Sequence, residues 1–300
     1  MEVEWDSLNL LITGASGLFG SKLAEIAVAR DYVVYSGYSR DPVASGVPIQ
    51  FDVSDKNQVE EVFKKVDPEV VVHAAALTDV DKCELNRELA WKINVEGARN
   101  IAEAVKSSHA FLVYISTDYV FNGQTGQYEE TDRTDPSNYY GFTKLKAEGL
   151  VNDLEEYCIA RASVLYGSTP AAGKINFALW LLSQLKKSEQ VKIVTDQWNS
   201  PTLNTNLAEM ILEIIERKLT GTFHLSGATR INRYDFAKVI AQTFNLDDNL
   251  ISPCSSADFS WAAKRPRDSS LNTEKAQQML KNKPLPIRQA LAVMKQELSQ

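Results

Sequence analysis

The sequence has few cysteines and no long apolar run. Its 300 residues include only three cysteines, Cys83, Cys158 and Cys254, which lie far apart and form no Cys-x-x-Cys pair. This pattern predicts neither a disulfide framework nor a zinc site. No stretch approaches the ~18 consecutive apolar residues of a membrane span, and the start MEVEWDSLNLLITG lacks the basic and apolar segments of a secretory leader. These absences predict a protein of the reducing cytoplasm.

Basic residues are outnumbered by acidic ones, 32 to 39, and only three histidines are present. The formal net charge is -7, which argues against a general affinity for phosphate backbones, so nucleic acid is not an expected partner. His109 and His224 have no cysteine or carboxylate neighbours at ligand spacing, and we expect no metal site. His73 ends an apolar stretch and is expected to be a core or cleft-wall residue.

The first half of the chain alternates between β-branched runs and amphipathic segments. Strands are expected at 8–13, from 32, at 70–76 and at 110–116, with helical periodicity between them. Strands that are apolar on both faces and joined by helices indicate an α/β fold with a doubly wound, Rossmann-type parallel sheet. Ligands in such folds bind at the carboxyl ends of the strands.

The regular alternation of strand-like and helix-like segments changes beyond about residue 167. The pattern predicts a dinucleotide-binding domain formed by 1–167 plus about 191–225, with the second of these segments returning to the main sheet. A smaller, mostly helical, substrate-binding lobe is expected from about 168–190 plus 226–300.

A glycine-rich stretch, TGASGLFG, follows the first expected strand and opens the first helix. Gly14, Gly17 and Gly20 allow a sharp turn, close approach of a diphosphate and tight helix-on-strand contact. The start of the helix offers free N–H groups and a positive dipole end to that diphosphate. The stretch therefore predicts dinucleotide binding, with Ser16, Leu18 and Phe19 also at the cofactor.

The end of the second expected strand bears on the choice of cofactor. An acidic residue there would favour NAD, but the sequence offers Ser39 and Arg40, and an arginine can grip a 2′-phosphate. These residues favour NADPH over NADH. The alternative is an exposed Arg40 paired with Asp41. A further short strand is expected between the second and the one at 70–76, and it ends at Asp52 and Val53, where an adenine would lie.

Tyr140 and Lys144 are four residues apart at an expected helix start, so the phenol and the ammonium share one face. A cation ~4 Å away at an effective dielectric of ~20 contributes about 4 kcal/mol, enough to lower a phenol pKa from ~10 to ~7. We expect such a tyrosine to donate a proton to a carbonyl oxygen, and the lysine also to hold the nicotinamide ribose. Thr117 ends a strand and can bond the same oxygen. Tyr139 lacks this spacing to Lys144.

Several motifs occur in the order found in a known family. They are TGASGLFG, VVHAAALTDVDKCE, INVEG, YISTDYVFNG, YYGFTKLKAE, DQWNSPT and RPRDSSLNTEK. Over nearly the whole chain this order resembles extended short-chain dehydrogenases/reductases, and within them the dTDP-4-dehydrorhamnose reductase family. The resemblance implies NADPH-dependent reduction of the 4-keto group of a nucleotide-linked deoxysugar, by a homodimer.

The resemblance also implies roles for individual residues. Thr117, Tyr140 and Lys144 would form the catalytic triad, and Asn94 would support Lys144 through a water. Ala74 and Ala75 would line the cofactor cleft. The residues expected near the sugar nucleotide are Val80, Thr117, Asp118, Tyr119, Asn176 and Arg265. Apart from the resemblance, the basic cluster Lys264, Arg265 and Arg267 is either a solvated loop or the candidate site of the second lobe for the substrate diphosphate.

The chain departs from the reductase pattern at RASVLYG, where Val164 replaces an aromatic residue that would face the substrate. The regulatory β subunit of methionine adenosyltransferase resembles the chain in this stretch and keeps the Tyr-Lys pair. An NADP-binding regulatory subunit for that enzyme is therefore an alternative. Another sugar-nucleotide enzyme, such as an epimerase, is a further one. A dehydratase is disfavoured because Tyr119 stands where such enzymes carry an acidic residue.

Overall fold

The computed structural model describes residues 8–171 and 174–299, so the acidic start of the chain lies outside the described part. A seven-stranded sheet forms its centre, in the order β11-β6-β5-β4-β1-β2-β3, and all neighbouring strands run parallel. The strands are β1 (Asn9–Thr13), β2 (Val33–Tyr38), β3 (Val47–Gln50), β4 (Val70–His73), β5 (Phe111–Thr117), β6 (Tyr157–Ala162) and β11 (Gly221–His224). The predicted doubly wound fold is confirmed.

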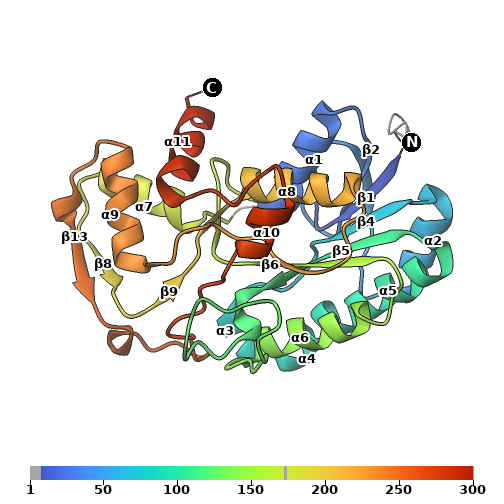
Figure 1. Ribbon diagram of the computed structural model, residues 1–300, viewed down its shortest axis with the longest axis horizontal. Coiled ribbons are helices and arrows are strands. Elements are labelled where there is room, and N and C mark those ends of the chain that lie inside the picture. Colours follow the sequence, from blue (N-terminus) through green and yellow to red (C-terminus); the bar gives the residue numbers. More distant parts are fainter. Residues whose placement is uncertain (1–7, 172–173, 300) are drawn as a thin grey trace.

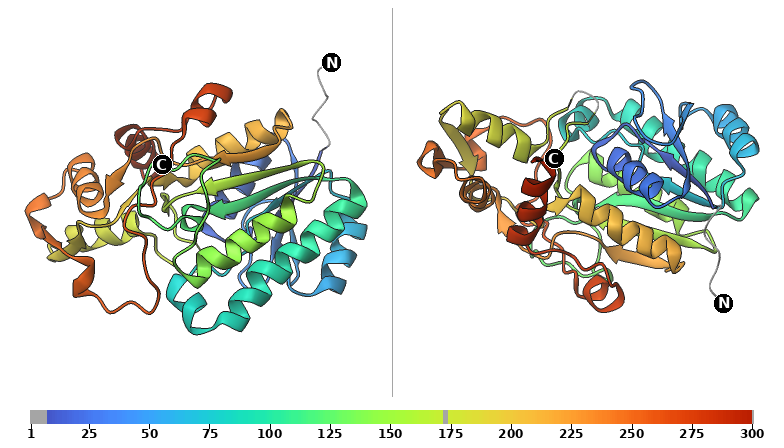
Figure 2. Two further views of the ribbon diagram at one scale, coloured as in Figure 1. Left: turned by 60° about the horizontal axis from the view of Figure 1, so that its bottom comes forward. Right: turned by 90° about the horizontal axis from the view of Figure 1, so that it is seen from above.

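Helices cover both faces of this sheet because its strands are apolar on both sides. Along β1, Leu10 and Ile12 face one buried cluster and Leu11 faces the other, as the alternation of side chains in a strand requires. The first cluster is covered by α1 (Leu18–Ala29), α8 (Asn204–Glu216) and α10 (Glu274–Met279). The second is covered by α2 (Lys56–Val66), α5 (Gly97–Ser108) and α6 (Tyr139–Val151). Figures 1 and 2 show these layers, with α5 and α6 side by side.

Short elements connect this framework. They are α3 (Val80–Leu85), α4 (Arg87–Trp91), the π-helix η1 (Lys92–Glu96), and the 3₁₀ turns η2 (Asp118–Val120), η3 (Asp248–Leu250) and η4 (Ser256–Asp258). The π-helix runs directly into α5. Two-residue strands pair β7 (Leu165–Tyr166) with β10 (Thr202–Leu203), and β9 (Trp198–Asn199) with β12 (Ile231–Asn232).

A second lobe lies beside the sheet (Figure 1). It contains α7 (Phe177–Lys186), β8 (Val191–Val194), α9 (Arg233–Thr243), β13 (Ile251–Cys254) and α11 (Ile287–Glu297). These elements share a separate buried cluster, in which Leu181, Phe236 and Leu291 are fully buried. An apolar core distinct from the two sheet clusters is what an independently packed lobe requires.

Two elements differ from the predicted division of the chain. The stretch from 191 was expected to return to the main sheet, but β8 pairs in parallel with β13, and Val191 and Ile193 pack in the core of the second lobe. Only α8 and β11 of that stretch return to the main sheet. Conversely α10, expected in the second lobe, buries Ala276 against the main sheet. In both cases the element packs where its apolar side chains become buried: β8 in the second lobe and α10 against the main sheet.

The order of strands places a crevice where the site was expected. The chain runs from β1 outward to β3 and then crosses back to β4 on the other side of β1. At such a reversal the connections leave in opposite directions and open a crevice at the carboxyl ends of the strands. Thr13 pairs with His73, and His73 pairs with Tyr114, so β1, β4 and β5 end close together at this edge.

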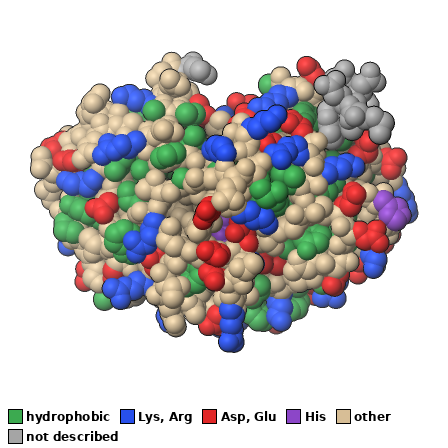
Figure 3. Space-filling model, in the orientation of Figure 1, with side chains coloured by type: hydrophobic (Ala, Val, Ile, Leu, Met, Phe, Trp, Pro, Cys, Tyr) green, Lys and Arg blue, Asp and Glu red, His purple; other side chains and the backbone are tan. Residues whose placement is uncertain are grey.

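The part of the chain that the structure describes contains no helix long and apolar enough to cross a membrane. On the face shown in Figure 3, acidic and basic side chains are interspersed, without a broad basic area.

Candidate active site

A cavity of about 940 Å³ lies at the carboxyl ends of the strands, with walls from both lobes. This is large enough for a dinucleotide together with part of a second ligand. Of the residues predicted at the site, those that line the cavity are Gly14, Ser16, Gly17, Leu18, Phe19, Gly20, Ser39, Arg40, Asp52, Val53, Ala74, Ala75, Val80, Thr117, Asp118, Tyr119, Tyr140, Lys144 and Asn176. Asn94 and Arg265 are not among its lining residues.

The glycine turn forms a backbone surface that side chains would destroy. Gly14 has φ +69°, and a Cβ on it would lie 2.7 Å from backbone atoms of Ala75. A Cβ on Gly20 would lie 2.3 Å from the carbonyl oxygen of Gly14. Gly17 precedes α1 and provides no side-chain cap, so N–H groups at the start of this helix remain available. The turn therefore fits the diphosphate of a dinucleotide.

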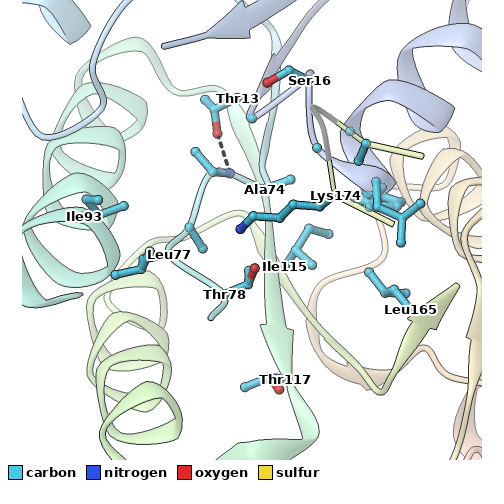
Figure 4. A pocket seen from close by; sticks show the side chains of 18 of the residues that line it. Thr13, Ser16, Ala74, Leu77, Thr78, Ile93, Ile115, Thr117, Leu165 and Lys174 are labelled. Carbon is cyan, nitrogen blue, oxygen red and sulfur yellow. Dashed lines mark hydrogen bonds between the residues drawn. The ribbon is translucent and has the colours of Figure 1, made fainter. Parts of the chain in front are cut away.

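Thr13 holds the other side of this turn in place. Its hydroxyl accepts a hydrogen bond from the Ala75 N–H at 3.2 Å, drawn in Figure 4, and bonds Nδ1 of His73 at 2.7 Å. His73 is 1% exposed, and burial lowers its pKa to about 3, so the ring is neutral. The expectation of a core histidine is confirmed.

Ser39 and Arg40 follow β2 and are exposed at one end of the cavity. No ion pair joins Arg40 to Asp41 within the described ranges. The carboxylate of Asp52 accepts hydrogen bonds from the N–H and the hydroxyl of Ser54 at 2.9 and 2.8 Å. The guanidinium of Arg40 is thus accessible to an anionic ligand, whereas Asp52 fixes its own loop.

Thr117, Tyr140 and Lys144 all line the cavity. Thr117 is the last residue of β5. Tyr140 and Lys144 lie on α6, whose start is capped by Asn138 through a 2.9 Å hydrogen bond from the Gly141 N–H. The Thr117 hydroxyl lies close enough to hydrogen-bond the Tyr140 phenol, which acts to lower the phenol pKa. The structure thus brings the three predicted residues to one cavity, and their catalytic role stays a prediction.

The predicted effect of Lys144 on Tyr140 is wrong for the structure as it stands. Burial raises the pKa of the Tyr140 phenol above its usual value of 10, and this outweighs the opposing hydrogen bond from Thr117. Burial also lowers the pKa of Lys144 to about 7, against the attraction of Glu148 and Cys83. The expectation considered the charge of the lysine but not the cost of burying both groups.

Asn94 makes three hydrogen bonds beside the cavity. It lies in the π-helix η1, and its Oδ1 accepts the Leu77 N–H at 2.7 Å. Its Nδ2 donates to the Leu77 carbonyl at 3.1 Å and to the Thr143 hydroxyl at 3.0 Å. Asn94 therefore joins a cavity-wall segment directly to α6, beside Lys144. The expected support of Lys144 by Asn94 through a water stays a prediction.

Asp118 lines the cavity, but hydrogen bonds from other residues of the protein occupy its carboxylate. Its carboxylate accepts hydrogen bonds from Ser269 at 2.5 Å, Ser163 at 2.9 Å and Thr117 at 3.1 Å. Burial raises its pKa to about 6, although these hydroxyl groups oppose the shift. Because Ser269 lies far along the chain, Asp118 connects the catalytic edge to the C-terminal segment. Tyr119 packs edge-on against Tyr140, with ring centroids 6.0 Å apart.

Two residues predicted at the substrate are engaged elsewhere. Asn176 lines the cavity, but its Oδ1 caps α7 by accepting the Leu179 N–H at 3.2 Å, and its Nδ2 donates to the Gly167 carbonyl at 2.9 Å. Arg265 donates to both carboxylate oxygens of Asp81, at 2.7 and 3.1 Å. This ion pair joins the second lobe to α3, so the predicted diphosphate contact of Arg265 is not supported.

The cavity also contains residues that the sequence interpretation missed. Arg233 lines it from the start of α9, and Lys174 reaches across it in Figure 4. A basic residue in the first turn of a helix opposes the helix dipole, and this is the signal that could have identified Arg233. Val164 adopts φ +41°, unusual for a β-branched residue. It lines the cavity where the departure from the reductase pattern was noted.

A parallel sheet with this glycine turn, and a Tyr-Lys pair on a helix beside it, define a Rossmann-type oxidoreductase of the short-chain dehydrogenase/reductase class. The family model described as "RmlD substrate binding domain" matches residues 8–300, and the chain belongs to this family.

The comparisons with individual proteins agree with this assignment. A probable low-salt glycan biosynthesis reductase from Haloferax volcanii is 33% identical over 265 residues, covering 87% of this chain and 88% of that protein. The methionine adenosyltransferase 2 subunit beta from Bos taurus is 31% identical over 281 residues, covering 90% of this chain and 82% of its own. The structure of a dTDP-4-dehydrorhamnose reductase from Bacillus anthracis in complex with NADP is 33% identical, with a TM-score of 0.86 over 96% of this chain and 98% of that one.

Proposed function

We propose that this protein reduces the 4-keto group of a nucleotide-linked deoxysugar with NADPH, as a reductase of the dTDP-4-dehydrorhamnose type. One observation carries the proposal: Thr117, Tyr140 and Lys144 line the same cavity as the glycine turn. A dinucleotide bound at the glycine turn and a substrate beside Tyr140 would therefore share one cavity. The relative from Bacillus anthracis, whose structure contains NADP, supports the same class of reaction.

The turn at Gly14, Gly17 and Gly20 would hold the diphosphate of the cofactor, and Lys144 would bond its nicotinamide ribose. When bound, NADPH supplies the hydride that reduces the keto carbon. The Tyr140 phenol donates its proton to the oxygen of that carbonyl, so that the product is an alcohol. The Thr117 hydroxyl, which donates to Asp118 at 3.1 Å, would turn its proton to the same oxygen and stabilise its developing charge.

The protonation states of the site suit reduction. With its pKa raised by burial, the Tyr140 phenol carries its proton at neutral pH, and it gives up that proton only as negative charge develops on the substrate oxygen. Once Tyr140 is a phenolate, its charge attracts a protonated Lys144, which lies one turn along α6 on the same helix face. Lys144, with a pKa of about 7, is near the middle of its titration there. A group near this point exchanges protons readily in either direction.

The preference for NADPH over NADH is assigned to Arg40. Its side chain is exposed at the end of β2, where the ribose 2′-position of a dinucleotide lies in this fold. A guanidinium there binds a phosphate through charge-assisted, bidentate hydrogen bonds.

The activity test mixes the purified protein with NADPH and dTDP-4-dehydro-L-rhamnose and follows the nicotinamide absorbance. Loss of absorbance that requires both substrates is the expected result, and product analysis should show an alcohol at C4. Matched controls replace NADPH with NADH and the keto sugar with dTDP-rhamnose. Absence of oxidation across a panel of dTDP-, UDP- and GDP-linked 4-keto sugars would exclude the proposal.

A regulatory role in S-adenosylmethionine synthesis is a second candidate. It is favoured by the similarity to the bovine β subunit and by Val164 in the cavity wall. The test is co-purification with a methionine adenosyltransferase and a change in its kinetics on mixing. Binding without any keto-sugar reduction would favour this role. An epimerase remains a third possibility, which the product analysis separates from reduction. We further propose a cytoplasmic homodimer, on the analogy of the family.

A further inference from the structure

Glu148 is a buried carboxylate on the helix that carries the catalytic pair. It lies on α6 one turn after Lys144 and two turns after Tyr140, so the three side chains share one face of the helix. Only 3% of Glu148 is exposed, and it is not among the residues that line the cavity. The catalytic face of α6 thus continues, behind the cavity wall, into a buried negative charge.

Two residues of the central sheet hold this carboxylate. Ser116 on β5 and Arg161 on β6 are paired in the register of the sheet, so their side chains leave the same face. The Ser116 hydroxyl donates to Oε1 of Glu148 at 2.5 Å. Arg161 donates from Nε to Oε1 at 3.0 Å and from a terminal nitrogen to Oε2 at 2.8 Å, a bidentate contact that fixes the carboxylate. Because Ser116 directly precedes Thr117, Glu148 ties α6 to the strand end that carries Thr117.

Two buried cations depend on this one anion. Arg161 is 5% exposed and remains protonated in proteins, and Lys144 is 3% exposed. In the described ranges the ion pair of Glu148 is with Arg161, at 2.8 Å. Its carboxylate is nevertheless also the strongest of the charges that favour the protonated form of Lys144. His224, the next residue across the sheet from Arg161, adds no charge, because burial and the guanidinium lower its pKa to about 3.

The other titratable groups near Lys144 are poorly suited to balance its charge. Burial raises the pKa of the Cys83 thiol to about 12 and that of the Tyr114 phenol well above 10, so both are uncharged at neutral pH. His73 is neutral there, with a pKa of about 3. Asp118 on η2 has a pKa of about 6, and three hydroxyl groups already occupy its carboxylate. The carboxylate on α6 is therefore the group placed to balance the ammonium.

We propose that Glu148 is a positioning residue, which fixes the catalytic face of α6 against β5 and supplies the buried negative charge that balances the Lys144 ammonium. This inference rests on the proposed function, in which a protonated Lys144 attracts the phenolate formed at Tyr140. Without the carboxylate, burial would take the proton from the lysine at neutral pH. Lys144 would then lose the charge through which it acts on Tyr140, although neither residue had been replaced.

The experiment needs no substrate. Urea unfolding over a range of pH compares the wild type with Lys144→Met, and Glu148→Gln with Glu148→Gln/Lys144→Met, so that each difference isolates the contribution of Lys144. In the wild type this contribution should rise with pH from about 7 upward, where the unfolded chain binds a proton that the folded protein has lost. Removing Glu148 removes the attraction that raises the pKa of Lys144. The rise should therefore begin about one pH unit lower, or more.

Glu148→Gln leaves the Arg161 guanidinium buried without its anion, and this loss of stability can prevent folding. The variant Glu148→Gln/Arg161→Met, with and without Lys144→Met, gives the same comparison without that cost, because replacing both members of a buried ion pair is often nearly neutral. If Glu148 only stabilised the fold, this variant would recover stability and turnover together. We expect its stability to return while the contribution of Lys144 still begins to rise at a lower pH than in the wild type.

The pH profile of keto-sugar reduction is the second readout. Turnover should fall as the pH rises through the pKa of Lys144, and in Glu148→Gln/Arg161→Met this fall should occur about one pH unit lower, which gives about tenfold lower turnover above both pKa values. The KM for the keto sugar should change little. Glu148→Asp keeps the charge and should keep most of the wild-type profile. The matched control is Glu213→Gln on α8, a carboxylate that is also 3% exposed and is bound by Arg217 at 2.6 Å. It should lose stability with an unchanged profile.

A contribution of Lys144 that begins to rise at the same pH with and without the Glu148 carboxylate would overturn the inference. So would recovery of the wild-type pH profile in Glu148→Gln/Arg161→Met. These outcomes are distinct from failure of the proposed function. A displaced rise in the unfolding experiment, with no keto sugar reduced by the wild type, would leave the link between Glu148 and Lys144 standing and remove the reductase. Keto-sugar reduction whose pH profile is insensitive to Glu148 would do the reverse.

Discussion

The ammonium of Lys144 lies 4.2 Å from the centroid of the Tyr114 ring. Tyr114 is fully buried in β5, next to His73 in β4, with ring centroids 5.7 Å apart. The lysine is thus held against an aromatic face in the sheet, and not in solvent. A cation–π contact stabilises the charged form, but in this position it does not replace the lost hydration. This is the physical reason that the pKa of Lys144 is lowered to about 7.

This position of Lys144 predicts a pH-dependent stability. Between about pH 7 and its usual pKa of 10.5, the lysine is deprotonated in the folded protein and protonated in the unfolded chain. The unfolded state then binds more protons, so the free energy of unfolding should rise with pH in this range. The rise relative to Lys144→Met should be at most about 1.4 kcal/mol per pH unit. Urea unfolding of both proteins at several pH values measures it.

The comparison with Lys144→Met removes the contributions of other groups. The titratable groups that face the lysine are Glu148 and Cys83, which favour its charge, and His73 and Tyr114. His73 stays neutral throughout this range because its pKa is about 3. A stability difference that does not vary with pH would show that Lys144 keeps its ordinary pKa.

Tyr140→Phe should remove most of the catalytic activity. The variant keeps the ring and its packing against Tyr119 but lacks the proton donor, so turnover should fall by about 10²–10⁴-fold. Affinity for NADPH should change far less, which steady-state kinetics and a binding titration together measure. Tyr139→Phe is the matched control, because Tyr139 does not line the cavity. Undiminished turnover in Tyr140→Phe would refute the assigned mechanism.

Gly20→Ala tests the glycine turn as a backbone surface. The added Cβ would meet the Gly14 carbonyl oxygen at 2.3 Å and Cα of Ala15 at 2.9 Å, and neither backbone atom can move aside cheaply. We expect a loss of about 1–3 kcal/mol of stability and weaker NADPH binding. Gly149→Ala is the control within α6, since no atom lies within 4 Å of its Cβ position. That variant should gain about 0.5–1 kcal/mol. Similar melting temperatures for both variants would contradict this account.

The features predicted correctly from the sequence are those encoded by neighbouring residues. The strand–helix alternation, the glycine turn and the four-residue Tyr140–Lys144 spacing each depend on local periodicity or steric demands. The site roles that differed depend on partners far along the chain. Asp118 is held by Ser269, 151 residues away, and Arg265 by Asp81, 184 residues away. Single-sequence patterns carry no information on such pairs, so residues that looked available to a ligand are already engaged.

Dependence on a distant partner also explains why β8 was predicted in the main sheet but lies in the second lobe. Its four residues, Val191–Val194, have the β-branched composition of a buried strand. That composition fits either sheet, and only pairing with β13, about sixty residues later, decides between them. The pKa of Tyr140 is a third case. The sequence showed a neighbouring lysine, but the depth of burial that reverses the shift is a property of the assembled fold.

Arg40 gives the last prediction, which concerns cofactor choice. The guanidinium is exposed, and the described part of the chain offers it no salt bridge, so its interactions remain available to a 2′-phosphate. Arg40→Ala should therefore weaken NADPH binding by about tenfold or more, because a charge-assisted contact is lost. NADH has no phosphate there, and its affinity should be nearly unchanged. The neighbouring Asp41→Asn is the matched control: it removes a negative charge beside the same phosphate, so NADPH should bind as well as before or somewhat better. Fluorescence titration of the wild type and both variants with NADPH and NADH measures the affinities. Each variant is compared with the wild type for each cofactor. An equal loss for NADH and NADPH in Arg40→Ala would mean that the arginine supports the loop and does not read the phosphate.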